Sequence, residues 1–146
     1  MDLYDMLRED HREVSRMLGE LESITRKRRK ALFLEVQDKV KLHFLVEEKH
    51  FYPALTHTGV AHDITLEAYE EHRLVELLLE ELDDMNAESD EWVARLKVLK
   101  ENIERHVREE EDEMFPRAQQ SLSEEQAQQI GASIVTEKAE QMALKP

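Results

Sequence analysis

The sequence predicts an all-α protein, an up-down-up-down four-helix bundle with an additional short C-terminal helix. Apolar residues recur at intervals of three and four along nearly the whole chain, which is the helical period. Only three Gly and three Pro interrupt the 146 residues, and no segment shows the alternating pattern of a β-strand. The second half of the chain also repeats the order of motifs found in the first, as expected for two paired helical hairpins.

The first helix is expected from about Leu3 to Ile24. Leucine and valine residues line one face of it at helical spacing, and His11 lies within that apolar face. The basic run 26–30 follows, where positive charge would complement a helix C-terminus. We interpret this run as a solvated junction; the alternative is a docking patch for an acidic partner.

The second helix is expected from about Lys30 to Tyr52. Its buried face changes along its length from apolar residues to His43 and Glu47, which lie one helical turn apart. Pro53 is expected to end this helix, because the residue before a proline avoids helical backbone angles.

The third and fourth helices are expected at about 62–85 and 92–115. Each carries an imidazole on an apolar face, His72 in the third helix and His106 in the fourth. Pro116 is expected to close the fourth helix. The two hairpins therefore contribute two histidine-bearing helices each.

Polar residues mark the starts of the later helices. Ser89 or Asp90 suits the N-cap of the fourth helix. The segment 123–126, Ser-Glu-Glu-Gln, is a capping box that opens a last helix. Gly131 in the middle of this helix argues against a long, straight element. We expect its apolar face to pack on the outside of the bundle, with an oligomer contact as the alternative.

Composition excludes several classes of protein. The chain has 34 acidic and 20 basic side chains and a formal charge of −14, which disfavours nucleic-acid and anionic-membrane partners. The absence of Cys excludes disulfides, iron–sulfur clusters and thiolate metal sites. No run approaches about 18 apolar residues, and the N-terminus has no signal-peptide pattern. We expect a cytoplasmic protein with a bundle at 1–118 and a C-terminal amphipathic helix at 119–146, in the same domain or as an appendage.

The most informative motif occurs twice, at 43–53 and at 106–116. Both copies read His, three residues, Glu-Glu, two residues, a large apolar residue, an aromatic residue and Pro. An acidic residue followed by His precedes each copy, at Asp10-His11 and at Glu71-His72. Because residues four apart share a helix face, each copy can present an imidazole and a carboxylate side by side.

Helical periodicity places six polar side chains inside the bundle: His11, His43, Glu47, His72, His106 and Glu110. One His on an apolar face is usually a core residue, but one on each of four helices, with two carboxylates, requires a cation. If each Glu bridges, two ions each receive two imidazoles and two carboxylate oxygens. This donor set suits iron, with manganese as the alternative, whereas zinc would settle for four ligands and no redox chemistry.

These motifs, over Leu3 to about Pro116, resemble those of the bacterial hemerythrin-like (HHE cation-binding) domain. The resemblance implies a non-haem di-iron centre in a hemerythrin-like bundle, a His4Glu2 site with the four histidines as terminal ligands and Glu47 and Glu110 as bridges. It also implies a protein that binds O2, NO or peroxide, for sensing, storage or stress protection. The alternatives are a di-iron enzyme that decomposes peroxide or NO, with an external electron donor for NO reduction, and an iron store or donor for iron-centre repair.

The resemblance has one departure. Oxygen-carrying hemerythrins have a fifth histidine four residues after that of the third helix, and this chain has Glu76 there. Four side chains are candidates for contact with the ligands or the metal: His50, Tyr69, Glu76 and Glu113. Glu48 and Glu111 are expected to face solvent or to form side-chain pairs along their own helix, because successive residues of an α-helix point about 100° apart.

Overall fold

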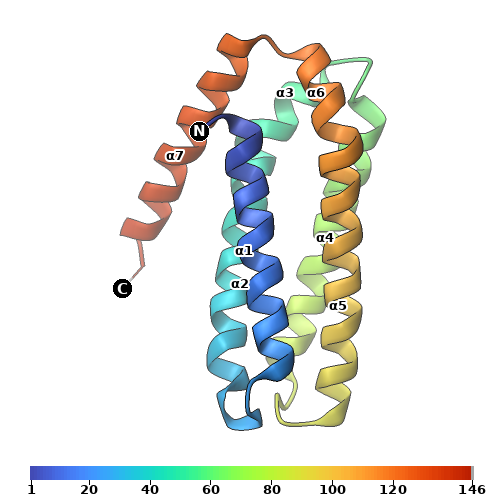
Figure 1. Cartoon of the computed structure of the whole chain (residues 1–146), viewed down its shortest axis with the longest axis vertical. Helices are drawn as coiled ribbons and strands as arrows, with labels where there is room; N and C mark the ends of the chain where they lie inside the picture. Colours follow the sequence, from blue (N-terminus) through green and yellow to red (C-terminus); the bar gives the residue numbers. More distant parts are fainter. Residues whose placement is uncertain (146) are drawn as a thin grey trace.

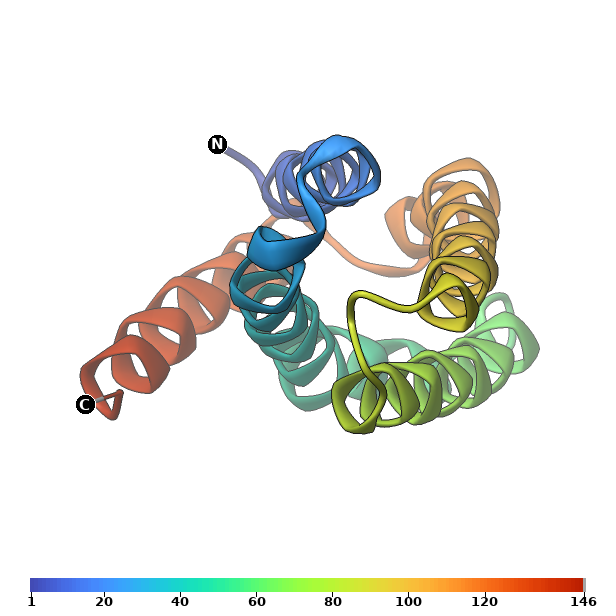
Figure 2. The ribbon, with the colours of Figure 1, turned by 90° about the horizontal axis from the view of Figure 1, so that it is seen from below.

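The computed structural model describes residues 1–145 and shows four long antiparallel helices packed as a bundle (Figure 1). The bundle helices are α1 (Leu3–Ser23), α2 (Arg29–Val46), α4 (His62–Asp84) and α5 (Asp90–Glu109). The remaining helices are α3 (Tyr52–Thr56), α6 (Phe115–Ser121) and α7 (Glu124–Ala143). The view from below shows the four bundle helices around a common centre, with α7 outside them beside α2 (Figure 2). The predicted fold class is confirmed.

Side-chain caps begin three of these helices. The Asp2 carboxylate accepts a hydrogen bond from the Asp5 N–H, and the Ser89 hydroxyl accepts one from the Trp92 N–H. Ser123 and Gln126 form the predicted capping box at the start of α7. Each such cap satisfies a backbone N–H that has no partner within the helix, and is worth about 1 kcal/mol.

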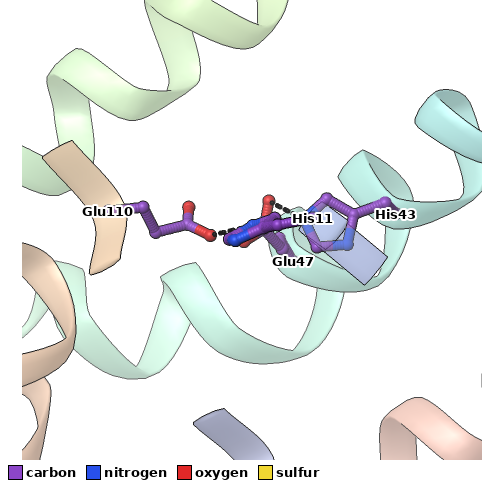
Figure 3. A group of neighbouring side chains, drawn as sticks. All are labelled: His11, His43, Glu47 and Glu110. Atoms are coloured by element: carbon purple, nitrogen blue, oxygen red, sulfur yellow. Dashed lines mark hydrogen bonds and ion pairs between the residues drawn. The ribbon is translucent and has the colours of Figure 1, made fainter. Parts of the chain in front are cut away.

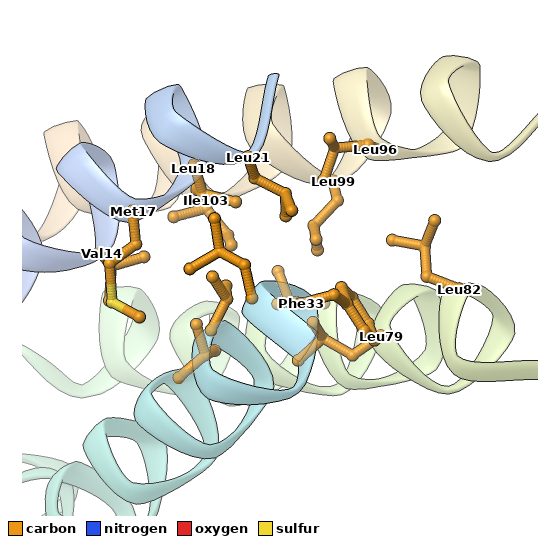
Figure 4. Packing of buried hydrophobic residues seen from close by; sticks show 14 of the residues in the cluster. Val14, Met17, Leu18, Leu21, Phe33, Leu79, Leu82, Leu96, Leu99 and Ile103 are labelled. Atoms are coloured by element: carbon orange, nitrogen blue, oxygen red, sulfur yellow. The ribbon is translucent and has the colours of Figure 1, made fainter. Parts of the chain in front are cut away.

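The apolar core has two parts. One lies toward the α4–α5 turn and is built from all four bundle helices (Figure 4). Trp92 is fully buried there, packs edge-on against Phe33 at 5.7 Å between ring centroids, and donates its indole N–H to the Leu82 carbonyl. The other part surrounds Phe51 and Phe115 near the opposite end. Along α1, His11 lies between Leu7 of the second part and Val14 of the first.

The chain does not leave the helical path at its prolines, contrary to the expectation that Pro53 and Pro116 end helices. A π-helical turn follows α2 at Glu47–Phe51 and another follows α5 at Glu110–Met114. Each proline lies in the first turn of the short helix that comes next. Its missing N–H is not needed at that position, so the helix continues.

The helix α7 runs without a break through Gly131, contrary to the expectation for this segment. It packs on α1, on α2 and on the first π turn, as expected for a helix on the bundle exterior. A Cβ at Gly131 would lie 3.3 Å from the Met6 side chain, so the glycine permits close approach of α7 to α1. Ile134 is buried one turn further along.

The basic run lies at a junction with exposed or half-buried side chains, as expected, and three of its residues also form contacts there. Arg26 and Arg29 donate to the carbonyls of Glu88 and Ala87, and Lys30 donates to the carbonyl and carboxylate of Asp83. The run therefore binds the turn between α4 and α5, where carbonyls at a helix end attract positive charge. Within residues 1–145, no helix is both long and apolar enough to cross a membrane.

Candidate metal centre

The six predicted side chains meet at the middle of the bundle. Two sets of four potential donor atoms form there, each set lying within 4.8 Å: His11, His43, Glu47 and Glu110 in the first, and Glu47, His72, His106 and Glu110 in the second. Figure 3 shows the first set, which converges from α1, α2 and the two π turns. All six side chains are buried, and both sets share the two glutamates.

The two glutamates lie between the sets in different ways. Glu47 Oε1 is 3.2 Å from the Nε2 atoms of both His43 and His72. Glu110 uses its two oxygens, with Oε1 3.0 Å from His11 Nε2 and Oε2 3.5 Å from His106 Nε2. Each of the two carboxylates thus lies where it could bind two ions.

Each of the four imidazoles in the cluster donates its Nδ1–H to a carboxylate on another segment. The four pairs are His11–Glu111 at 2.6 Å, His43–Asp10 at 2.9 Å, His72–Glu48 at 2.8 Å and His106–Glu71 at 2.7 Å. An ionised carboxylate can only accept, so the proton lies on Nδ1 and the lone pair on Nε2 faces the centre. Such pairs fix the orientation of metal-binding histidines and raise their basicity.

The expectation that Glu48 and Glu111 face solvent was wrong, and the π turns explain why. In each turn the hydrogen bond runs from residue i+5 to residue i, from Tyr52 N–H to the Glu47 carbonyl and from Phe115 N–H to the Glu110 carbonyl. The wider turn changes the angle between consecutive side chains, so a Glu-Glu pair can reach inward with both members. The first glutamate of each pair then joins the cluster, and the second supports an imidazole.

The unpaired atoms of the cluster fit a cation. The facing Nε2 atoms of His11 and His43 are 3.1 Å apart, and so are those of His72 and His106. With both protons on Nδ1, each pair brings two lone pairs together, which is repulsive unless a positive charge lies near. Glu47 Oε2 and Glu110 Oε1 are buried and have no hydrogen-bond partner among residues 1–145. Buried charges of this kind require a partner such as a metal ion.

Protonation equilibria point the same way. Burial and the neighbouring Glu110 carboxylate raise the pKa of Glu47 well above its usual value. Burial alone would lower the pKa of His11, but the adjacent carboxylates of Glu110 and Glu111 outweigh this and raise the pKa to about 10. Without a metal, the cluster therefore holds protons in place of cations.

The sequence interpretation missed Tyr52. Its side chain is fully buried, and its hydroxyl lies 2.5 Å from Glu110 Oε2, 3.1 Å from His72 Nε2 and 3.3 Å from Glu47 Oε1. Burial and the two carboxylates raise the pKa of Tyr52 well above its usual value, so the phenol keeps its proton. The matching position in the second half is Phe115, and this difference within the repeat was the available signal.

The other candidates lie away from the cluster. His50 donates from Nε2 to Glu137 of α7 at 3.0 Å and contacts no ligand, which corrects that expectation. Tyr69 packs edge-on against Tyr52, at 5.2 Å between ring centroids, and among the described residues forms no hydrogen bond to a ligand. Glu76 and Glu113 belong to neither donor set; Glu76 is half-buried and Glu113 is exposed.

Fold and site together define a class of protein, a helical bundle whose interior offers two adjoining His/Glu donor sets to metal cations. Residues 2–118 match the model of the hemerythrin HHE cation binding domain, and the chain belongs to this family. The resemblance inferred from the motifs is thereby confirmed.

Two known proteins are similar to the chain. The crystal structure of a hemerythrin HHE cation binding domain-containing protein, the Rv2633c homolog from Mycobacterium kansasii, superposes with a TM-score of 0.85. That match covers 96% of this chain and 86% of the other at 23% identity, so it shows the fold. A protein named DNA nickase from Nostoc sp. is 28% identical over 130 residues. The match covers 88% of this chain but only 37% of the length of that relative.

Proposed function

We propose that the chain is a non-haem di-iron protein that binds O2, NO or peroxide, for sensing, storage or stress protection. The observation that supports this most is the sharing of Glu47 and Glu110 by two buried four-donor sets. His11 and His43 would hold one ion, and His72 and His106 the other. Imidazole with carboxylate suits iron, and manganese or zinc are the alternative occupants. When bound, a pair of iron ions supplies redox chemistry and positions for small ligands.

The surroundings of the donor sets favour a small ligand. A small cavity lies beside them, lined by His11, His43 and His106 and by the apolar side chains of Val14, Val40, Phe44, Ile103 and Val107. Phe44 stacks on His72 with 3.6 Å between ring centroids, and Phe115 stacks on His11 at 6.2 Å. These aromatic rings hold the imidazoles in place and keep bulk water from the donor atoms. Such close surroundings exclude a larger substrate, which favours a diatomic molecule or peroxide.

Ligand binding can be tested on the full chain loaded anaerobically with ferrous iron. We expect two irons per chain and a change in the visible spectrum on exposure to O2, NO or peroxide. His43→Ala should reduce the iron content, whereas His57→Ala, in an exposed loop residue, should not. Protein that retains only zinc or no metal, or whose spectrum responds to none of the three ligands, contradicts the proposal.

Tyr52 favours a second candidate function, an enzyme that decomposes peroxide. Its phenol O–H lies against both shared carboxylates and can donate a hydrogen bond inside the cluster. Disproportionation of peroxide to water and O2 needs no outside reductant, whereas NO reduction requires an external electron donor. Tyr52→Phe should keep the iron content and lower peroxide consumption by about 100-fold or more, the usual effect of losing a preorganised hydrogen-bond donor. Wild-type consumption no faster than that of free iron rejects this candidate.

We propose neither a nucleic-acid nor a membrane partner. The match to the relative named DNA nickase covers only 37% of the length of that protein, so its name is not carried over to this chain. The formal charge of −14 repels phosphate backbones and anionic lipid.

A further inference from the structure

The helix α7 reaches the metal centre through one side chain. Lys138 Nζ lies 2.6 Å from Asp10 Oδ2, and the same oxygen accepts the Nδ1–H of His43 at 2.9 Å. Asp10 is buried, and Lys39 approaches its other oxygen at 3.5 Å. The carboxylate that orients His43 is therefore held between an imidazole and two ammonium groups.

The neighbours of Lys138 hold it in this position. Glu137 is buried and accepts from Lys49 at 2.8 Å and from His50 at 3.0 Å, both in the first π turn. Ile134 and Gly131 pack one and two turns earlier on the same helix. The ammonium group of Lys138 is thus carried by a helix whose preceding two turns are docked on the bundle.

Within residues 1–145, no ammonium group forms an ion pair with the equivalent carboxylate in the other half of the centre. Glu71 occupies the place equivalent to Asp10 and accepts the Nδ1–H of His106 at 2.7 Å. Its other charged neighbours are the Glu109 carboxylate and the Arg105 guanidinium, which forms no ion pair with it. No lysine or arginine within residues 1–145 forms an ion pair with Glu71, and α7 packs on the α1 and α2 side of the bundle.

We infer that Lys138 makes the two metal positions unequal, by weakening cation binding at the His11–His43 position relative to the His72–His106 position. This inference rests on the proposed function and goes beyond it. The ammonium group of Lys138 lies behind the Asp10 carboxylate and repels a cation that approaches His43. Because Asp10 is buried, water and salt screen this repulsion only in part. The His72–His106 position, supported by Glu48 and Glu71, should therefore fill first.

A titration of the full chain with Co²⁺ tests the order of filling, by calorimetry and by the visible absorption of the bound ion. The wild type should show two binding events with dissociation constants that differ by about tenfold, the size expected for one charge at this range. His43→Ala should remove the weaker event and His106→Ala the tighter one.

The role of Lys138 is isolated by three variants. Lys138→Gln keeps a hydrogen-bond donor without the charge and should tighten the weaker event until the two constants converge. Lys138→Arg keeps the charge and should behave as the wild type. Lys145→Met removes the same charge from the exposed end of the chain, where Lys145 pairs with Asp38 at 3.5 Å, and should change neither event.

The outcomes separate this inference from the proposed function. Two equal dissociation constants in the wild type would overturn the inference. So would a Lys138→Gln variant whose weaker binding event is unchanged or weaker still. Neither result contradicts the proposal that the chain binds metal. Equal effects of Lys138→Gln and Lys145→Met overturn it too, because they indicate only long-range charge. A wild-type chain that takes up neither Co²⁺ nor iron overturns both proposals.

Discussion

The carboxylates that hydrogen-bond to the four imidazoles are as much a part of the site as the side chains that would bind the metal. Glu111 is part-buried, and its hydrogen bond with His11 is 2.6 Å long. Removing it leaves the ring of His11 free to turn and to exchange its proton between the two nitrogens. The carboxylate is thus a positioning residue that acts through the histidine.

Glu111→Ala should weaken metal binding by about 10 to 100-fold, the usual cost of losing a carboxylate behind a metal-binding histidine. Competition with a chelator measures the change. Asp112→Ala is a matched control, since Asp112 is the next residue along and is exposed. Equal affinity in Glu111→Ala and the wild type would show that the orientation of His11 does not depend on this carboxylate.

The two π turns determine which side chains reach the metal centre. A π turn accommodates one more residue than the α-helical path it replaces. Deleting Asp112 should return the second π turn to an α-helix and turn Glu111 away from His11, while Phe115 stays in the core. We expect unchanged helix content by circular dichroism and a loss of metal affinity as large as that of Glu111→Ala. Retained affinity would mean that the π turn has no part in building the site.

The docking of α7 should depend on pH through Glu137. Hydrogen bonds from Gln141, Lys49 and His50 lower the pKa of Glu137 to about 2, from an ordinary value of 4.5. A lowered pKa stabilises the folded state above pH 4.5, and this contribution is lost as the pH falls from 4.5 toward 2. Glu137→Gln should therefore lower the melting temperature of the metal-free protein at pH 7 and have little effect near pH 2.

Glu140→Gln provides the control for this pH dependence, because Glu140 is exposed on the same helix. It should leave the melting temperature near that of the wild type at both pH values. A Glu137→Gln variant with the same deficit at pH 7 and at pH 2 would contradict an ionic origin.

For the whole molecule, metal and folding should be coupled, because the donor sets are assembled from all four bundle helices. An ion that binds only the folded state stabilises it by about 2.7 kcal/mol when its free concentration is 100 times the dissociation constant. We expect added ferrous iron or Co²⁺ to raise the melting temperature of the wild type and to leave that of a His43→Ala, His106→Ala double variant unchanged. An equal rise in both proteins would place the binding elsewhere.

The fold and the six central side chains could be predicted from the sequence, because both follow from the α-helical period. His11 and His72 lie within apolar faces, and His43 and Glu47 are one turn apart. The roles of Glu48 and Tyr52 could not be predicted in this way, since each depends on a turn that departs from that period. The contact of Lys138 with Asp10 joins residues 128 apart in the chain and follows from no local pattern.

The four histidine–carboxylate bonds have a consequence for assembly. Taken in turn, α1 donates to the second π turn after α5, α5 donates to α4, α4 donates to the first π turn after α2, and α2 donates to α1. These bonds form a closed ring around the bundle, in which each of the four segments gives one hydrogen bond and receives one. A helix that slides by a turn, or is exchanged with that of another molecule in a different register, breaks the ring at two places. The donor sets are therefore complete only in a correctly assembled bundle, so that metal uptake reports on the folding of the chain.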